Sequence, residues 1–336
     1  MLRIGVLGAG HLGKIHLRQI KEIESYALAG FYDPNPEMTI LAENELGITS
    51  FPSISSLIDA VDVVDIVTPT LSHFDCALEA IAKHKHIFIE KPLTYTVEEA
   101  DILVRKVREA GIKAQVGHVE RFNPAFLKAM EFNLKPMFIE SSRIAQYNPR
   151  GTDVSVVLDL MIHDIDIILN LIPSEVKHIS ASGVPIISES PDIANARIEF
   201  ENGYVANVTA SRASLKNERK MRLFQKDAYI TINFLDKKVD IYEIKTLEGE
   251  SDNPFALVID PGNGKKKKEI LFSSPKVPEI NAIRHELALF AHSILNDHEP
   301  PVTIVDGFRS LKLAHQILTK IHEGQIKANL HQDEVL

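Results

Sequence analysis

The chain has 336 residues, a length typical of two domains, and its 45% hydrophobic and 25% charged residues are ordinary for a globular protein. Its formal net charge of −9 argues against partners such as nucleic acid or an anionic membrane surface. The single cysteine, Cys76, excludes an intramolecular disulfide, and no apolar run reaches the roughly 18 residues of a membrane span. We therefore expect a cytoplasmic protein.

The first third begins with a strand, a glycine-rich turn and a helix. Residues 2–7 are apolar, residues 8–13 read GAGHLG, and residues 14–23 have helical spacing. A second apolar run over residues 27–32 ends in an acid, about 20 residues beyond the last glycine. Such glycines allow a tight turn, a close approach of the backbone to a pyrophosphate, and close packing of helix on strand. The pattern predicts a dinucleotide site made by Gly8, Gly10, His11, Leu12, Gly13 and Asp33.

The acid at the end of the second strand favours NAD over NADP. The carboxylate of Asp33 would accept a hydrogen bond from a ribose hydroxyl and would repel a 2′-phosphate. The next residues, Pro34 and Asn35, bring no arginine that could hold such a phosphate.

Strands and helices continue to alternate to about residue 120. We expect strands over residues 61–67, 86–89 and 113–116, and helices over residues 71–82 and 97–110. This alternation predicts an α/β domain, residues 1–120, with a doubly wound parallel sheet of the Rossmann type. Ligands bind at the carboxyl ends of such strands, where the sequence places Thr68, Pro69, His73, Glu90, Lys91, Arg121 and Asn123. His73 would lie beside the cofactor or on the surface, and Cys76 would be a small buried residue.

Residues 121–336 predict a second, α+β domain. A helix over residues 123–132 and a strand over 136–147 come first, and helices over 281–295 and 307–323 come last. Between them, strands follow one another without helices over residues 175–182, 193–200, 204–211, 219–224 and 228–234, which predicts an open, mostly antiparallel sheet. The least regular segment, residues 254–278, holds the run Lys265–Lys268, which fits a solvated loop tip or a phosphate-binding loop.

One predicted helix, residues 153–172, is apolar on almost every side and carries Asp159, His163 and Asp166 on one stripe. A carboxylate and an imidazole are costly to bury unless they are hydrogen-bonded or line a cavity. The stripe therefore indicates either a proton-handling site or a satisfied core histidine. We expect no metal there, because no further histidine or cysteine ligand is evident. Asp166 would form an ion pair with Arg121 or Arg143.

Several of these segments resemble one protein family. The strings GAGHLG (8–13), TPTLSH (68–73), EKP (90–92) and DLMIH (159–163) resemble the Gfo/Idh/MocA oxidoreductases, NAD(P)-dependent enzymes that act mostly on sugars and cyclitols. The resemblance implies that Lys91, Asp159 and His163 are catalytic. It also implies a second domain with helices on one face of an open sheet, which often forms a subunit interface, so that a homodimer or homotetramer is expected.

A narrower resemblance concerns the substrate. The strings VGHVERFNPA (116–125) and TDVSVVLDLMIHDIDIIL (152–169) resemble the UDP-N-acetylglucosamine 3-dehydrogenase branch, which oxidises the sugar 3-hydroxyl. His163 would then be the general base, Lys91 would donate to the reacting oxygen, and Asp159 would orient the imidazole or bind a sugar hydroxyl. Contacts to the nucleotide sugar would come from Arg121, Asn123, Arg143, Tyr147 and Arg150. For Arg143, Tyr147 and Arg150, ordinary surface positions are the alternative.

Two other functions fit the same cofactor site. The substrate could be a free sugar, an inositol or a bilin-like molecule, or the chain could be an NAD-bound sensor without chemistry. The presence of Lys91, Asp159 and His163 together favours an enzyme, because a sensor has no physical need for all three.

Overall fold

The computed structural model describes residues 1–148, 154–249, 251 and 257–333, in two compact units. The first unit comprises Met1–Phe122 and Asn281–His315, and the second comprises Asn123–Ile280 and Gln316–Leu336. A single division at residue 120 does not describe these units, because a later segment of the chain returns to the first one.

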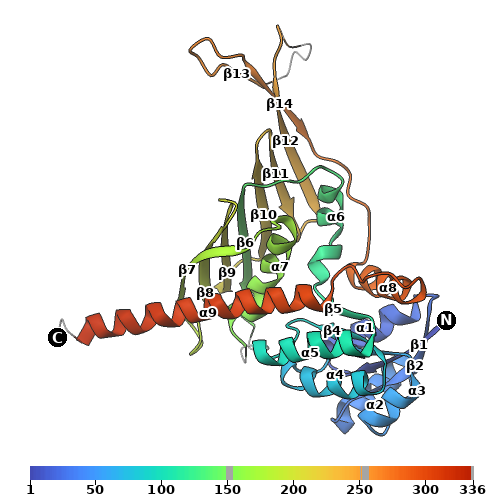
Figure 1. The fold of residues 1–336 in the computed structure, drawn as a ribbon. Helices are drawn as coiled ribbons and strands as arrows, with labels where there is room; N and C mark the ends of the chain where they lie inside the picture. Colours follow the sequence, from blue (N-terminus) through green and yellow to red (C-terminus); the bar gives the residue numbers. More distant parts are fainter. Residues whose placement is uncertain (149–153, 250, 252–256, 334–336) are drawn as a thin grey trace. The chain divides into compact units, whose positions relative to one another are not determined.

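The first unit is built on a parallel sheet (Figure 1). Within residues 1–122, all of which the structure describes, five strands lie in the order β2-β1-β3-β4-β5. Their bounds are β1 (Leu2–Leu7), β2 (Tyr26–Tyr32), β3 (Val63–Ile66), β4 (His86–Glu90) and β5 (Ala114–Gly117). The strand order reverses direction between β1 and β3, which is the point where doubly wound sheets bind their ligands. The predicted fold class of this unit is confirmed.

The helices of the first unit are α1 (His11–Lys21), α2 (Pro36–Leu46), α3 (Ile54–Ala60), α4 (His73–Ala82), α5 (Val97–Ala110) and α8 (Ala282–Leu295), with short 3-10 turns η1 (Thr70–Ser72) and η2 (Val119–Phe122). The bounds of α5 follow from its ends. A capping box joins Thr96 and Glu99 at its start, and Gly111 ends it in the left-handed conformation.

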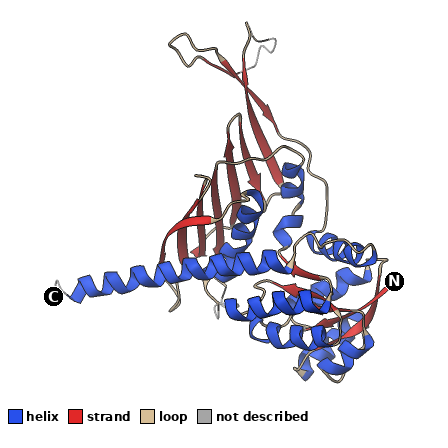
Figure 2. Ribbon diagram, viewed as in Figure 1, coloured by secondary structure: helices blue, strands red, loops and turns tan. Residues whose placement is uncertain are grey.

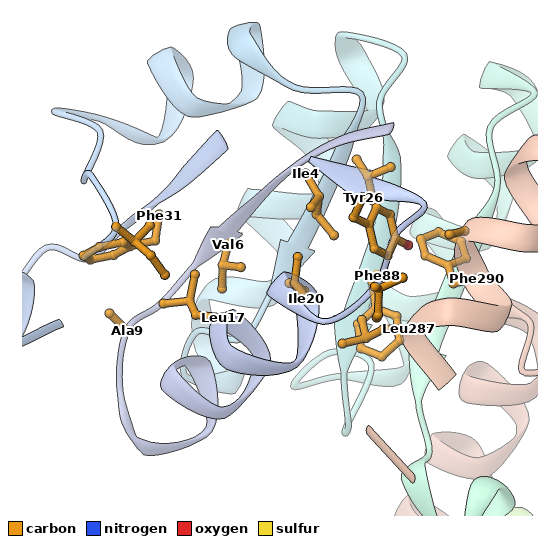
Figure 3. Packing of buried hydrophobic residues seen from close by; sticks show 14 of the residues in the cluster. Ile4, Val6, Ala9, Leu17, Ile20, Tyr26, Phe31, Phe88, Leu287 and Phe290 are labelled. Carbon is orange, nitrogen blue, oxygen red and sulfur yellow. The ribbon is translucent and has the colours of Figure 1, made fainter. Parts of the chain in front are cut away.

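The core of the first unit contains residues that lie far apart in the sequence (Figure 3). Leu287 and Phe290 of α8 pack with Tyr26 and Phe88 in one buried cluster. An apolar stripe predicts that a helix is packed, but it does not say against which core. Helix α8 therefore belongs to the first unit and not to the second domain expected over residues 121–336.

The second unit is built on a large sheet (Figure 2). Among its described residues, nine strands lie in the order β13-β14-β12-β11-β10-β6-β9-β8-β7. Their bounds are β6 (Phe138–Gln146), β7 (Val176–Val184), β8 (Ile193–Phe200), β9 (Val205–Ser214), β10 (Glu218–Gln225), β11 (Ala228–Asn233), β12 (Lys238–Thr246), β13 (Leu257–Ile259) and β14 (Lys268–Ser273). Neighbours are antiparallel except β6 and β9, which are parallel. The run Lys265–Lys267 is exposed in the turn between β13 and β14, as expected of a loop tip.

Helix α6 (Pro124–Met130) packs on β11 and β12, and α7 (Ile162–Leu171) packs on β6 and β9. The helix predicted over residues 153–172 is interrupted: a π-helical turn, η3 (Val157–Met161), precedes α7. The π-helical turn changes the angular spacing that the sequence analysis assumed for Asp159 and His163. Helix α9 (Ile304–Asp333) is the last element, and its residues from Gln316 on belong to the second unit.

Candidate active site

The three glycines of the first turn have three different surroundings. Gly8 has a φ of +101°, which favours glycine, and a Cβ on Gly13 would collide with the Gly8 carbonyl oxygen. A Cβ on Gly10 would meet no atom of the described chain within 4 Å. Gly8 and Gly13 are thus needed for the turn and for close packing, whereas Gly10 faces open space. This is the division of roles that a pyrophosphate-binding turn requires.

Helix α1 begins at this turn without a side-chain cap. Gly10 is its N-cap residue, and the first turn carries no acidic residue among the described positions. The first N–H groups of a helix and its dipole attract anions. The start of α1 is therefore suited to hold the phosphates of a dinucleotide.

A cavity of about 590 Å³ opens beside this helix start. It is lined by Gly8, Gly10, His11, Leu12, Gly13, Tyr32, Asp33, Pro34, Asn35, Met38, Ile54, Val67, Thr68, Pro69, Ser72 and Cys76. The structure thus brings together eight of the predicted cofactor residues and adds apolar walls that the sequence analysis did not name. Cys76 is buried as predicted, and burial, followed by the charges of Asp75 and Glu79, raises its thiol pKa to about 11.

The carboxylate of Asp33 is held at the end of β2. Its Oδ2 accepts from the Ala9 N–H at 2.8 Å and its Oδ1 accepts from the Asn35 N–H at 2.9 Å. A carboxylate oxygen can accept more than one hydrogen bond, so Asp33 is fixed by the backbone and keeps acceptor capacity toward a ribose hydroxyl. The glycine turn, the helix start and this acid together fit NAD.

His73 is 1% exposed, so the surface alternative is wrong. Its Nε2 lies 2.9 Å from the Thr68 carbonyl oxygen and its Nδ1 lies 3.0 Å from the Pro92 carbonyl oxygen. Burial lowers the pKa of this imidazole, against the effect of the two carbonyls. The side chain joins the loop after β3 to the loop after β4. The second of these loops begins with Lys91, which is half-buried, directly after the buried Glu90 at the end of β4.

Asp159 and His163 lie in the second unit, and Lys91 lies in the first. Asp159 is in η3 and His163 is in the first turn of α7, and both side chains are half-buried although most of their neighbours are buried. π-helical turns are rare and are frequent at functional sites. This segment therefore remains the candidate for proton handling.

Arg143 is 2% exposed, so its surface alternative is also wrong. Its Nε and Nη2 each lie 3.0 Å from a carboxylate oxygen of Asp164, next to His163 in sequence. Planar bidentate pairs of this kind fix geometry as well as charge. The sequence analysis named Asp166 for this arginine and had not singled out Asp164. The pair attaches α7 to β6.

The other predicted substrate residues have different settings. Arg121 is buried in the first unit, with Nη2 3.7 Å from Asp306 Oδ1. Asn123 caps α6 by accepting from the Ala125 N–H at 3.0 Å. Tyr147 is 40% exposed just after β6, and Arg150 lies outside the described residues.

A buried pair that no sequence pattern indicated contacts the backbone just before η3. Arg212 donates from Nε to Asp192 at 3.0 Å and from Nη1 to the Val154 carbonyl oxygen at 2.8 Å. Both charged side chains are almost fully buried. Val154 shortly precedes η3, so Arg212 connects β9 to the start of the segment that carries Asp159.

Two features are absent from the described residues, a metal-binding cluster and a membrane-spanning helix. In that part of the chain, no group of three or more His, Cys, Asp or Glu side chains has an arrangement that could hold a metal ion. No helix described by the structure combines the length and the apolar character needed to cross a membrane.

Comparison with known proteins agrees with this site. The Gfo/Idh/MocA oxidoreductase family, with an NAD-binding Rossmann fold, matches residues 2–118, and the Gfo/Idh/MocA C-terminal domain matches residues 104–231. The chain is 39% identical over 243 residues to UDP-N-acetylglucosamine 3-dehydrogenase of Acidithiobacillus ferrooxidans, covering 72% of this chain and 77% of that protein. It is 33% identical over 233 residues to scyllo-inositol 2-dehydrogenase (NAD(+)) of Bacillus subtilis, covering 63% and 68%.

The likeness extends to the fold. A solved structure of the Acidithiobacillus ferrooxidans UDP-N-acetylglucosamine 3-dehydrogenase has a TM-score of 0.85 with 33% sequence identity, covering 95% of this chain and 97% of that one. The NAD-binding turn and the matches to both family domains agree, and the related proteins act on sugar and cyclitol hydroxyls. The chain belongs to the Gfo/Idh/MocA family and is an NAD-dependent oxidoreductase acting on CH–OH groups.

Proposed function

We propose that the protein oxidises the 3-hydroxyl of UDP-N-acetylglucosamine or of a closely related nucleotide sugar. The observation that carries this proposal is the 39% identity to a UDP-N-acetylglucosamine 3-dehydrogenase, together with a structural match to such an enzyme over 95% of the chain. The structural match includes the half that follows the NAD-binding unit, where the family's specificity would have to reside.

The proposed chemistry divides among three side chains. Bound NAD supplies the acceptor for the hydride that leaves the sugar carbon. His163 removes the hydroxyl proton, a role for which imidazole is the side chain used most often. Lys91 donates to the reacting oxygen and stabilises its developing negative charge. Asp159, just before His163 in the chain, orients the imidazole or binds a sugar hydroxyl.

Other residues have two further roles, which are to contact the nucleotide sugar and to hold the helices in place. Arg121 and Tyr147 are our candidates for contacts to the nucleotide sugar, and Arg150 stays a candidate from the sequence. The buried pair of Arg143 with Asp164 supports a different role for Arg143, which is to hold α7 and with it His163. Asn123 likewise is suited to fix the start of α6.

The test is turnover by the purified protein with NAD and UDP-N-acetylglucosamine. NADH absorbance and sugar mass are followed, with and without 2-oxoglutarate and an aminotransferase that removes a 3-keto product. We expect the sugar to lose two hydrogen atoms, and we expect His163→Ala and Lys91→Met to abolish the loss. His84→Asn, a change at an exposed histidine outside the site, is the matched control. Turnover that persists in His163→Ala would overturn its assignment as the base.

A second candidate substrate is an inositol. It is favoured by the 33% identity to a scyllo-inositol 2-dehydrogenase. The same assay with scyllo-inositol and myo-inositol separates the two. Turnover of an inositol without turnover of the nucleotide sugar would replace the leading proposal.

We also propose that a second copy of the chain covers the sheet face opposite α6 and α7. Five aromatic side chains lie directly opposite one another across neighbouring strands on that face, with centroids 4.9–5.7 Å apart: Phe138, Phe224, Tyr229, Tyr242 and Phe272. Partly exposed apolar patches mark association surfaces. Light scattering should give a mass above 37.5 kDa, lowered by Tyr242→Glu. A monomer in the unsubstituted protein would overturn this proposal.

A further inference from the structure

A cluster of charged side chains is buried in the first unit below the loop that carries Lys91. His16 of α1, Asp65 of β3 and Glu286 of α8 are 0% exposed, and Glu90 at the end of β4 is 7% exposed. His16 Nδ1 lies 2.9 Å from Asp65 Oδ2. On its other side, His16 Nε2 lies 3.2 Å from Glu90 Oε1, an ion-pair contact rather than an aligned hydrogen bond. Two acids thus contact one imidazole, and a third, Glu286, is buried in the same cluster.

The protonation of this cluster follows from its surroundings. Burial lowers the pKa of His16, but the charge and hydrogen bond of Asp65, and then its contact with Glu90, outweigh burial, and the pKa is raised well above the ordinary value. Burial, and then the charge of Glu90, raise the pKa of Glu286 well above its ordinary value. Burial and the nearby Asp65 also raise the pKa of Tyr26, on β2. Burial also raises the pKa of Asp65, against the charge and hydrogen bond of His16. The raised pKa of His16 favours an imidazolium in contact with Asp65 and Glu90, beside a neutral Glu286 and a neutral phenol.

The carboxylate of Glu90 connects this cluster to Lys91. Its Oε2 accepts from the Lys91 N–H at 3.2 Å. It is packed against Gly117, where an added Cβ would lie only 2.6 Å from Glu90 Oε1. The loop beyond Lys91 is held separately by His73, through the Pro92 carbonyl oxygen at 3.0 Å. Glu90 is therefore confined on one side by His16 and on another by β5.

We propose that His16 is a positioning residue for Lys91. Its imidazolium holds the Glu90 side chain in place, and Glu90 in turn fixes the backbone at Lys91. The inference rests on the proposed catalytic role of Lys91, and it extends the site to a side chain of α1. Without the cation, two buried carboxylates would face each other, and one of them would take up a proton. Glu90 would then lose the contact that holds it on the side of α1.

The kinetic test compares His16→Gln and His16→Asn with His84→Asn. Glutamine retains a donor near the position of Nε2, and asparagine retains one near Nδ1, but neither carries a charge. His84 is exposed and has a φ of +53°, which asparagine tolerates, so its variant controls for loss of a histidine. The substrate is whichever sugar or inositol the unsubstituted protein oxidises, and NAD affinity is measured by calorimetry without turnover.

We expect both His16 variants to lower kcat by about 10²-fold, the size of effect that a misplaced catalytic group causes, while NAD affinity changes little. We also expect the pH profile of kcat/KM to gain an ionisation in the neutral range that the control lacks, from the uncompensated carboxylates. Equal kcat and an unchanged pH profile in the His16 variants would overturn the proposal. A loss of thermal stability alone, without a changed profile, would also overturn it, because that result indicates a structural role only.

A spectroscopic test does not depend on turnover. The chain has 14 histidines, and the ring nitrogens of His16 are assigned in a ¹⁵N-histidine spectrum by their absence in His16→Gln. We expect the ring nitrogens of His16 to keep the ¹⁵N chemical shifts of an imidazolium well above the ordinary histidine pKa of about 6.5. Titration near that ordinary value would overturn the proposal. If no sugar is oxidised but His16 stays charged, the proposed function fails and the state of the cluster stands.

Discussion

The two units shift the pKa of a buried acid in opposite directions. In the second unit, Asp192 accepts from the N–H groups of Ile186, Ile187 and Ser188 at 2.8, 2.6 and 2.9 Å, and it faces Arg212. Burial raises the pKa of Asp192, but the hydrogen bond from the Ser188 hydroxyl and then those from the three N–H groups outweigh burial, and the pKa ends well below its ordinary range. In the first unit, neither carboxyl oxygen of Glu286 has a hydrogen-bond partner among the described residues, and its pKa is raised.

The difference shows that burial alone does not decide the charge of an acid. Donors supplied by the backbone and by an arginine keep Asp192 ionised, so this pair is a fixed structural clamp. The acids around His16 receive fewer hydrogen bonds than their oxygens could accept. The protonation state of each acid therefore depends on that of the others. A cluster of the second kind is the more sensitive to substitution and to pH.

The largest expected effect is that of breaking the clamp. Arg212→Met leaves Asp192 buried without its cation, which typically costs about 3–5 kcal/mol of stability. Arg197→Met, which removes an exposed pair with Glu199 on the same sheet, should cost less than about 1 kcal/mol. Urea unfolding of both variants gives the comparison. Equal losses would contradict the role of Arg212 as the partner of a buried charge.

The clamp also predicts the direction of a pH effect. Because the folded-state pKa of Asp192 is lowered, its contribution to stability is present above the unfolded pKa of about 3.9 and is lost as the pH falls through the folded pKa. The stability difference between the unsubstituted protein and Arg212→Met should therefore be constant near neutral pH and shrink in acid.

A smaller and opposite pH effect is expected from Glu286→Gln. The folded state keeps a proton that the unfolded state releases above about pH 4.3, so the unsubstituted protein loses stability as the pH rises toward the folded pKa. The variant, which mimics the neutral acid, should lack this slope of about 1.4 kcal/mol per pH unit. Denaturation at several pH values measures the slope, and Glu299→Gln, an exposed change, is the control. Parallel slopes in all proteins would mean that Glu286 is ionised when folded.

The smallest expected effect is that of an exposed pair. Lys266, in the turn between β13 and β14, pairs with Glu248, and both side chains are more than half exposed. Lys266→Ala should change stability by less than about 0.5 kcal/mol, since water screens such pairs. A loss much above about 1 kcal/mol at several protein concentrations would indicate that this turn is covered in solution.

The sequence predicts the bounds of helices and strands correctly where apolar spacing and end signals are both present. The bounds of β1 and α5 are those expected, because apolar spacing and end signals agree there. Helix α2 was missed because it buries only Ala42 and has no apolar stripe. Strand β12 was missed although Val239 and Ile241 alternate with polar residues, since charged neighbours obscure the pattern.

The site was predicted where its residues are local and missed where they are distant. The glycine turn and Asp33 lie within one strand–helix–strand segment, and they line one cavity. His16 and Glu286 are 270 positions apart in the sequence, and no local pattern connects them. One signal was available: Asp65 stands alone in the apolar strand VVDI, where a charge requires a buried partner.

The return of α8 to the first unit has a consequence for synthesis. A ribosome that has made residues 1–122 has produced every strand of the parallel sheet, but Leu287, Phe290 and Ala291, which complete one of its cores, are still to come. Phe88 and Tyr26 lack these packing partners until residues 123–280 have been translated. The nascent first unit thus exposes apolar side chains until α8 emerges, and we expect a fragment ending near residue 120 to be less stable than the whole unit.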